Sequence, residues 1–186
     1  IYINDLFNLP IKGRAYGFAD DLAINYSAKT YKDVLSDFNH DSGLLLPWFR
    51  ENKLHLSTEK CNYIIYAYKT PAWQNEMKLT FKGREIMRVN EFKYLGLWFD
   101  SKLTWKKQSI YIQNKLRKLN YLFFHFKKYL NSKHLTTLYR ALYESTMSYG
   151  VIHWGSSCHI KPVKVLQNKV CRTIHQLHKR TSEAEI

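Results

Sequence analysis

Apolar side chains between Thr104 and Leu130 recur in alternating steps of three and four residues. The residues on this spacing are Ile112, Leu116, Leu119, Phe123, Phe126 and Leu130. Because an α-helix turns once every 3.6 residues, such a spacing places all of them on one face. The pattern predicts a long amphipathic helix that buries a single stripe.

Two further helical patterns follow this one. Ser132 is a favourable N-cap for a helix that runs to Gly150. Its expected inward residues are Leu135, Leu138, Leu142 and Thr146. Pro162 suits the first turn of a last helix. The inward residues of that helix are expected to be Val163, Leu166, Val170, Ile174 and Leu177. Residues 101–186 therefore read as an all-helical bundle.

Residues 1–100 mix strands with one helix. Residues 15–19 and 22–27 read as short strands on either side of Asp20 and Asp21. The spacing of Thr30 and Asp33 predicts a capped helix that runs to about Asn52. Gly43 should weaken this helix, and Pro47 should bend or break it.

More strands are expected after the helix. Residues 61–68 and 92–99 each read as one strand, and residues 78–89 read as a hairpin that turns at Lys82-Gly83. The fold class predicted from these patterns is α+β. The boundary between the two predicted domains, 1–100 and 101–186, is drawn where the composition changes.

The change in composition at residue 100 is mainly one of charge. The chain has 29 Lys and Arg against 15 Asp and Glu, a net charge of +14. Residues 1–100 carry 13 basic and 12 acidic side chains, whereas residues 101–186 carry 16 basic and 3 acidic ones. Such a one-sided balance favours a polyanionic partner, most commonly nucleic acid. The alternative is a charged surface that serves only solubility.

Seven of these basic residues are predicted to bind nucleic acid. They lie along the helical pattern between Thr104 and Leu130: Lys106, Lys107, Lys115, Arg117, Lys118, Lys127 and Lys128. Trp105, Trp154 and the tyrosines could stack on bases, although aromatic residues at helical or strand spacing usually pack in a core.

Membrane and secretory features are absent from the sequence. No apolar run approaches the roughly 20 residues of a membrane span, and the N-terminus lacks the pattern of a signal peptide. Three widely spaced cysteines fit a reducing compartment. We expect an intracellular protein without a membrane partner. The first residues, which lack a methionine, are expected to belong to the interior of a longer protein.

Asp20 and Asp21 stand side by side between two apolar runs. Adjacent carboxylates repel each other, so the pair calls for an explanation. Two strands joined at this point would display both carboxylates at a hairpin tip, where Mg²⁺ could bind them and offset the repulsion. The alternative is an ordinary acidic turn, since Asp is common in turns.

A zinc site is a weaker possibility in the second half. Cys158, His159, Cys171 and His175, with His153 nearby, supply ligand types that zinc prefers. Cys158 and His159 are adjacent, however, which strains tetrahedral coordination.

Five segments along the chain resemble motifs of reverse transcriptases from non-LTR retrotransposons of the jockey type. The segment YGFADDLAI resembles their Tyr/Phe-Ala-Asp-Asp box, and IYINDL before it resembles the end of the preceding motif. The segment at 46–66 resembles the next motif, with Ser57 and Cys61 in place of the usual Asn and Thr and with Lys60 retained. FKYLGLWFDSKLTW resembles the Tyr-Leu-Gly primer-grip motif, and residues 138–157 resemble a later Tyr-Gly…Trp-Gly region.

This resemblance implies a partial polymerase palm of antiparallel strands plus a helix, followed by a thumb-like bundle. It implies DNA synthesis from an RNA template and a DNA primer, with dNTP substrates and two Mg²⁺ or Mn²⁺ ions. One ion would activate the primer 3′-hydroxyl and the other would steady the triphosphate. Asp20 and Asp21 would be the metal ligands, and Lys60 would neutralise the departing pyrophosphate. Tyr94, Leu95, Gly96 and Leu97 would hold the primer end.

The same resemblance requires parts that residues 1–186 do not contain. The other metal-binding aspartate, the nucleotide-selecting segment and the fingers are expected upstream of IYINDL. We therefore expect a C-terminal fragment of a polymerase that is inactive alone, and nuclear if its parent element is active. The alternative is a non-enzymatic remnant whose basic helices still bind nucleic acid.

Overall fold

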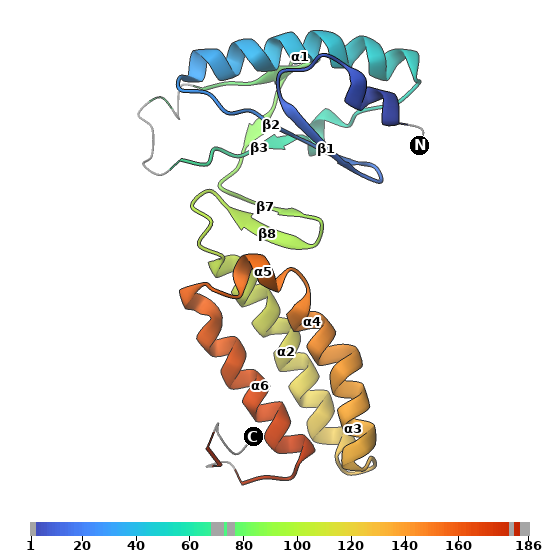
Figure 1. Cartoon of the computed structure of the whole chain (residues 1–186), viewed down its shortest axis with the longest axis vertical. Coiled ribbons are helices and arrows are strands. Elements are labelled where there is room, and N and C mark those ends of the chain that lie inside the picture. The colour runs from blue at the N-terminus through green and yellow to red at the C-terminus, as the bar shows by residue number, and fades with distance from the viewer. Residues whose placement is uncertain (1–2, 68–72, 74–76, 179–180, 183–186) are drawn as a thin grey trace. The chain divides into compact units, whose positions relative to one another are not determined.

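The chain forms two units, Ile1–Asn90 and Glu91–Ile186, in a computed structural model (Figure 1). The structure describes residues 3–67, 73, 77–178 and 181–182. The first unit combines short strands with one long helix, and the second combines a β-hairpin with several helices. The predicted α+β class is confirmed. The boundary between the units lies ten residues before the change in charge at residue 100.

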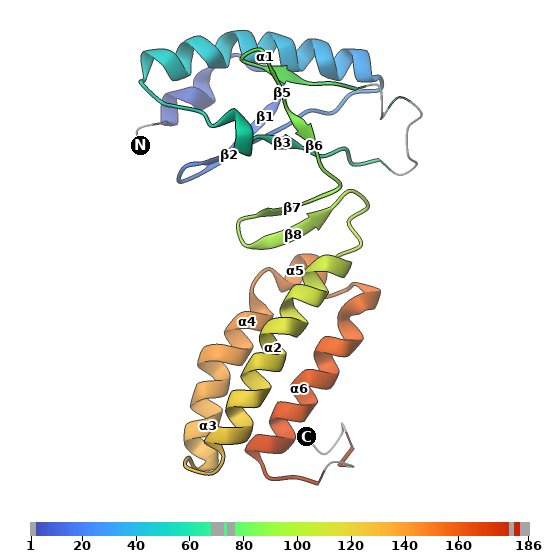
Figure 2. The same ribbon diagram turned by 180° about the vertical axis from the view of Figure 1, so that it is seen from behind.

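The first unit is built on a hairpin and a helix (Figures 1 and 2). Strands β1 (Arg14–Phe18) and β2 (Asp21–Asn25) pair antiparallel, and α1 (Tyr31–Glu51) follows. Thr30 caps α1 as predicted, because its hydroxyl accepts a hydrogen bond from the Asp33 backbone N–H at 3.2 Å. The hairpin packs on a core shared by α1 and the 3-10 helix Asn4–Asn8. This core consists of Leu6, Leu45, Trp48 and Phe49.

Helix α1 continues through Pro47, so of the two outcomes expected there, a bend or a break, the break is wrong. Proline in a helix interior costs about 3 kcal/mol, partly because its ring clashes with the carbonyl four residues earlier. Leu45, Trp48 and Phe49 flank the proline and are all buried. Burying each such side chain stabilises the fold by about 1.5–3 kcal/mol, which is enough to keep the helix intact.

A buried aspartate fixes the chain where it enters β1. Asp41, on α1, is fully buried and accepts hydrogen bonds from the backbone N–H groups of Lys12 at 2.9 Å and Gly13 at 2.8 Å. His40 Nδ1 lies 3.0 Å from the same carboxylate. Burial alone would raise the pKa of Asp41, but these hydrogen bonds outweigh it and hold the pKa below its ordinary value.

The rest of the first unit consists of very short strands. β3 (Asn62–Tyr63) pairs parallel with β6 (Met87–Arg88), and β4 (Thr80–Phe81) pairs antiparallel with β5 (Arg84–Glu85). The predicted turn at Lys82-Gly83 is confirmed, with positive φ values of 52° and 71°. The strand predicted at 61–68 is much shorter than expected, because only its first residues find a partner strand; Tyr68 lies outside the described residues.

The second unit opens with a hairpin where the sequence predicted one strand. β7 (Glu91–Tyr94) and β8 (Leu97–Asp100) pair antiparallel around a turn at Leu95-Gly96. Both turn residues have positive φ, 45° and 82°, as a type I′ turn requires. The alternation of residues 92–99 suggested a continuous strand, because Leu rarely takes this backbone conformation.

The helices of the second unit, drawn in Figures 1 and 2, contribute side chains to one hydrophobic core. They are α2 (Lys106–Phe126), α3 (Ser132–Leu138), a π-helix (Tyr139–Glu144), α4 (Ser145–Ser148), α5 (Val151–Trp154), the 3-10 helix Cys158–Ile160 and α6 (Lys161–Ile174). The predicted stripe of α2 is confirmed: Ile112, Leu116 and Phe123 are buried, and the other three pack against the same core. The β7–β8 hairpin contributes Leu97 to this core.

Two details of the second predicted helix are wrong. Asn131, one residue before Ser132, is the N-cap, and its side chain accepts a hydrogen bond from the His134 N–H at 3.0 Å. Leu142 is 41% exposed and Tyr143 is fully buried in its place. The π-helix has more residues per turn than an α-helix, which moves the inward positions along the chain. Leu177, beyond the end of α6, is also exposed.

None of the helices that the structure describes is long and apolar enough to cross a membrane.

Candidate catalytic hairpin and nucleic-acid interface

The two aspartates lie at the tip of the first hairpin. Phe18 pairs with Asp21, so Ala19 and Asp20 form the turn, and Asp21 is the first residue of β2. Ala19 has a positive φ of 52°. Both carboxylates are exposed. The predicted hairpin is therefore confirmed, and its tip presents two acidic side chains to solvent.

The two faces of this hairpin differ in character. Residues directly opposite each other in an antiparallel pair share a face. Leu22 and Ile24 lie on the face that packs on the core. The other face carries Asp21 beside Phe18, which is 64% exposed, and Tyr16, which is 48% exposed. Because Asp20 lies in the turn, strand alternation sets the direction of Asp21 only.

The two carboxylates of the hairpin do not by themselves form a complete metal site within the described residues. Two neighbouring carboxylates supply the oxygen ligands that Mg²⁺ prefers. In the part of the chain that the structure describes, however, no three His, Cys, Asp or Glu side chains gather closely enough to hold a metal ion. The cysteines and histidines at 153–175 are included in that search, so the structure gives no support to the zinc alternative.

Lys60, the third predicted catalytic residue, ends the 3-10 helix Thr58–Lys60 and is exposed. Its backbone N–H donates to the Ser57 carbonyl at 3.1 Å. This turn fixes the backbone and leaves the ammonium in solvent.

The predicted primer-grip residues surround the β7–β8 turn. Tyr149 donates a hydrogen bond from its hydroxyl to the Leu95 carbonyl at 2.6 Å. Leu97 is buried beneath Gly150, where a Cβ atom would lie 2.7 Å from the Leu97 side chain. Tyr94 is half-buried beside Phe92. The turn is thus fastened to the segment between α4 and α5.

Gly96→Val is expected to destabilise the second unit by about 1–2 kcal/mol or more, because an L-residue in the left-handed region carries a penalty of that size. A Cβ at Gly96 would also lie 3.2 Å from the Tyr149 ring. Urea denaturation measures the change. Gly43→Ala is the control, since Gly43 lies in α1 with nothing within 4 Å of an added Cβ. This variant should be more stable than the unmodified chain by about 0.5–1 kcal/mol. Equal stability of Gly96→Val and the unmodified chain would contradict this account of the turn.

Asp100 connects the hairpin to α2. Its carboxylate accepts hydrogen bonds from the backbone N–H groups of Lys102 at 3.2 Å, Thr104 at 2.9 Å and Trp105 at 2.9 Å. The Thr104 hydroxyl adds another at 3.1 Å. Partial burial would raise the pKa of Asp100, but these hydrogen bonds lower it below its ordinary value. The start of α2 is therefore held in place relative to β8.

The predicted nucleic-acid-binding residues lie on α2 and the turn after it. Those that are exposed are Lys106, Lys115, Arg117, Lys118, Lys127 and Lys128. Lys107 differs, because its ammonium forms an ion pair with Glu91 and lies 3.7 Å from the centre of the Trp98 ring. Arg117 is oriented by hydrogen bonds to Asn114 at 2.7 Å and Gln113 at 3.1 Å.

Exposed aromatic residues are interspersed among these cations. Tyr121, Phe124 and Tyr129 are exposed, Tyr129 by 83%. Lys127 lies 4.6 Å from the centre of the Phe124 ring. Trp154, in contrast, is fully buried and donates to the Tyr149 carbonyl at 3.0 Å, so it is a core residue and cannot stack on bases. A cationic surface with exposed rings suits a nucleic-acid strand.

Comparison with known proteins identifies relatives of the chain. It is 26% identical over 166 residues to the probable RNA-directed DNA polymerase from transposon X-element of Drosophila melanogaster. It is also 24% and 22% identical to the RNA-directed DNA polymerases from mobile element jockey of Drosophila melanogaster and Drosophila funebris. The chain is a distant homologue of these retrotransposon reverse transcriptases.

The match covers 84% of this reverse-transcriptase homologue but only 17–18% of the length of each relative. The resemblance to non-LTR retrotransposon enzymes is confirmed. No family model matches the chain, and no solved structure matches it.

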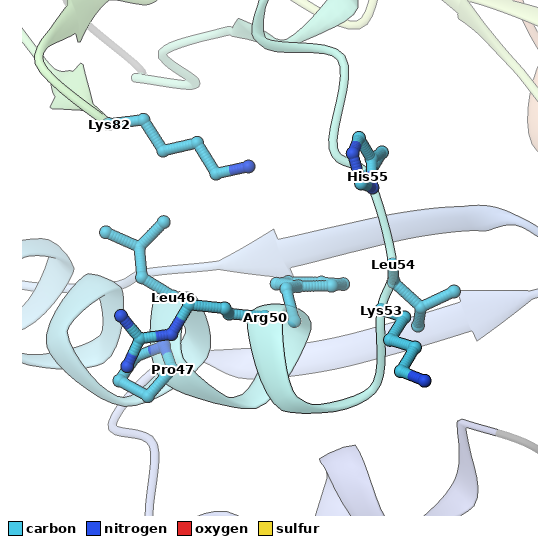
Figure 3. Close-up of a pocket in the computed structure, with 8 residues that line it drawn as sticks. Leu46, Pro47, Arg50, Lys53, Leu54, His55 and Lys82 are labelled. Atoms are coloured by element: carbon cyan, nitrogen blue, oxygen red, sulfur yellow. The ribbon is translucent and has the colours of Figure 1, made fainter.

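The first unit of this homologue also has a cationic pocket that the sequence patterns did not indicate. The pocket has a volume of about 400 Å³ and lies between the end of α1 and the β4–β5 turn. Figure 3 shows Lys82 across from Leu46 and Pro47 of α1, with Arg50, Lys53 and His55 around the same cavity. Its lining includes no carboxylate. Lys82 lies more than 25 positions from the other lining residues, which is why no local motif revealed it.

Proposed function

We propose that the chain is part of an RNA-directed DNA polymerase of a non-LTR retrotransposon. The observation that carries the proposal is the exposed Asp20-Asp21 pair at a hairpin turn, in a chain homologous to such polymerases over most of its length. Carboxylates held at a tight turn are suited to a metal-dependent nucleotidyl transfer, and they are poorly suited to a purely structural role because they repel each other.

In the complete enzyme the first unit forms part of the palm. Asp20 and Asp21 would hold Mg²⁺ or Mn²⁺ together with a further ligand from outside the described residues. Such a metal would supply activation of the primer 3′-hydroxyl and charge neutralisation at the dNTP phosphates. Lys60 places a positive charge for the departing pyrophosphate, and the turn from Tyr94 to Leu97 positions the primer end.

The second unit serves as the thumb, and it holds the paired RNA template and DNA primer. Support comes from the 16 basic and 3 acidic side chains of residues 101–186. The exposed face of α2 provides both the cations and the rings for contacts with a phosphate backbone. Contacts of this kind carry little sequence preference.

A salt titration of the whole chain with a DNA duplex tests this assignment. Replacing four exposed lysines of the second unit by Gln should make the slope of log affinity against log salt less steep by about 3–4. Each phosphate contact that is lost reduces the steepness of this slope by about 0.9. The lysines are Lys106, Lys118, Lys127 and Lys128. The control replaces four exposed lysines of the first unit: Lys29, Lys32, Lys60 and Lys78. Equal slopes for the two quadruple variants would refute the assignment of binding to the second unit.

A non-enzymatic nucleic-acid-binding remnant is the second candidate function. It is favoured by the concentration of positive charge in residues 101–186, away from the aspartates. The two functions differ in what they require of Asp20. A binding remnant needs only the basic surface, whereas a polymerase needs the carboxylate as well.

A further inference from the structure

Two lysines converge on one tyrosine between the β7–β8 hairpin and α2. Lys93 Nζ lies 3.3 Å from the Tyr111 hydroxyl oxygen and 4.7 Å from the centre of its ring. Lys115 Nζ also lies 4.7 Å from the ring centre. Both ammonium groups are therefore held within a few ångströms of the same phenol.

The fold brings these three residues together from separate elements. Lys93 pairs with Trp98 across the hairpin, so both side chains share one face of it. Lys107, Tyr111 and Lys115 follow one another at four-residue intervals and line one side of α2. Lys107 contacts Trp98, and Lys93 contacts Tyr111. The result is a continuous surface of alternating cations and rings.

The charges on this surface are only partly compensated. Lys107 is paired with Glu91. Neither Lys93 nor Lys115 forms an ion pair with a carboxylate among the residues that the structure describes. The neighbouring ammonium groups of Lys115 and Lys93 outweigh partial burial and lower the pKa of Tyr111. The phenol therefore lies in a positive field that an anion would relieve.

We propose that Lys93, Tyr111 and Lys115 bind one backbone phosphate of a nucleic acid. This inference rests on the proposed function and names a specific contact within it. Two ammonium groups and a phenolic O–H can all donate to the oxygens of a single phosphate. A nucleic acid fits better than an isolated anion, because further exposed cations follow along the chain: Lys118 on α2, and Lys127 and Lys128 on the turn after it. Neither Lys93 nor Tyr111 belongs to the predicted basic set.

The test uses the whole chain, a DNA duplex and single substitutions. Lys93→Gln and Lys115→Gln should each lower the salt slope by about 0.9, the value of one phosphate contact. Tyr111→Phe should weaken binding while leaving the slope nearly unchanged, because it removes a donor and no charge. Lys133→Gln is the matched control, an exposed lysine at the start of α3. It should leave both the affinity and the slope close to those of the unmodified chain.

A second measurement follows the phenol itself. With tyrosines labelled at Cζ with ¹³C, the NMR signal absent from Tyr111→Phe reports the titration of Tyr111. Adding the DNA duplex should raise the pKa of Tyr111, because a bound phosphate offsets the field of the lysines. Two results together would overturn the site. The pKa of Tyr111 would be the same with and without DNA, and the salt slopes of Lys93→Gln and Lys115→Gln would equal that of Lys133→Gln. An acidic peptide that raises the Tyr111 pKa when DNA does not would also overturn it.

The proposed function and this site can fail separately. If the unmodified chain shows no salt-dependent binding to DNA, nucleic-acid binding by the second unit fails and the site with it. If the unmodified chain binds DNA with the expected salt dependence, but Lys93→Gln, Tyr111→Phe and Lys115→Gln all behave like Lys133→Gln, only the site fails.

Discussion

Asp20→Asn is expected to abolish RNA-templated DNA synthesis in an enzyme that carries this chain in place of the matching segment of the X-element polymerase. Mutating a residue that hydrogen-bonds to a metal ligand lowers metal affinity or activity by about 10–100-fold. Replacing a ligand itself should therefore lower the rate of synthesis by at least roughly 100-fold. Primer extension on an RNA template measures the effect. Asp21→Asn should harm synthesis less, because Asp21 is directed by β2 toward the exposed face with Phe18 and Tyr16.

The same substitution should leave the isolated chain as stable as before, or slightly more stable. Both carboxylates are exposed at a turn, and removing one charge relieves their repulsion. Thermal denaturation of the 186-residue chain is the measurement. Glu85→Gln, which removes an exposed charge from β5, is the control and should affect neither stability nor synthesis. Synthesis that survives Asp20→Asn would refute the role assigned to Asp20.

Trp154→Ala is expected to lower the free energy of unfolding of the second unit by about 3–5 kcal/mol, the usual cost of truncating a buried aromatic residue. Trp154 is fully buried in α5, and its indole N–H is bonded to the Tyr149 carbonyl. Removing it leaves a cavity beside the segment that holds the β7–β8 turn. Urea denaturation followed by circular dichroism measures the loss.

Ile152→Ala provides the matched control in the same short helix. Ile152 is 90% exposed, so its truncation should change the free energy of unfolding by less than about 0.5 kcal/mol. Similar losses for the two variants would mean that α5 does not pack as described.

Helical periodicity predicted the core of the second unit well. The stripe from Ile112 to Leu130 is local, and a 3.6-residue period leaves one choice of face. The errors occur where the backbone departs from regular geometry. The π-helix moves the inward position from Leu142 to Tyr143, and no sequence pattern distinguishes it from an α-helix. The β7–β8 turn was not predicted because Leu95 has a positive φ, which is rare for leucine.

Contacts between distant residues could not be predicted from local patterns. Asp41 accepts hydrogen bonds from backbone groups nearly thirty residues earlier, and such bonds have no sequence signature. At the candidate site, the Asp20-Asp21 hairpin was predictable because both strands and the turn are contiguous. The group formed by Lys93, Tyr111 and Lys115 was not, because it depends on how the hairpin packs against α2.

The most direct test of the proposed function is RNA-templated primer extension by the hybrid enzyme with Asp20 and Asp21 intact. The account predicts incorporation of labelled dNTPs that requires the RNA template, the DNA primer and Mg²⁺ or Mn²⁺. A folded hybrid that binds the template and primer with steep salt dependence, yet adds no nucleotide, would contradict the polymerase assignment and favour the binding remnant.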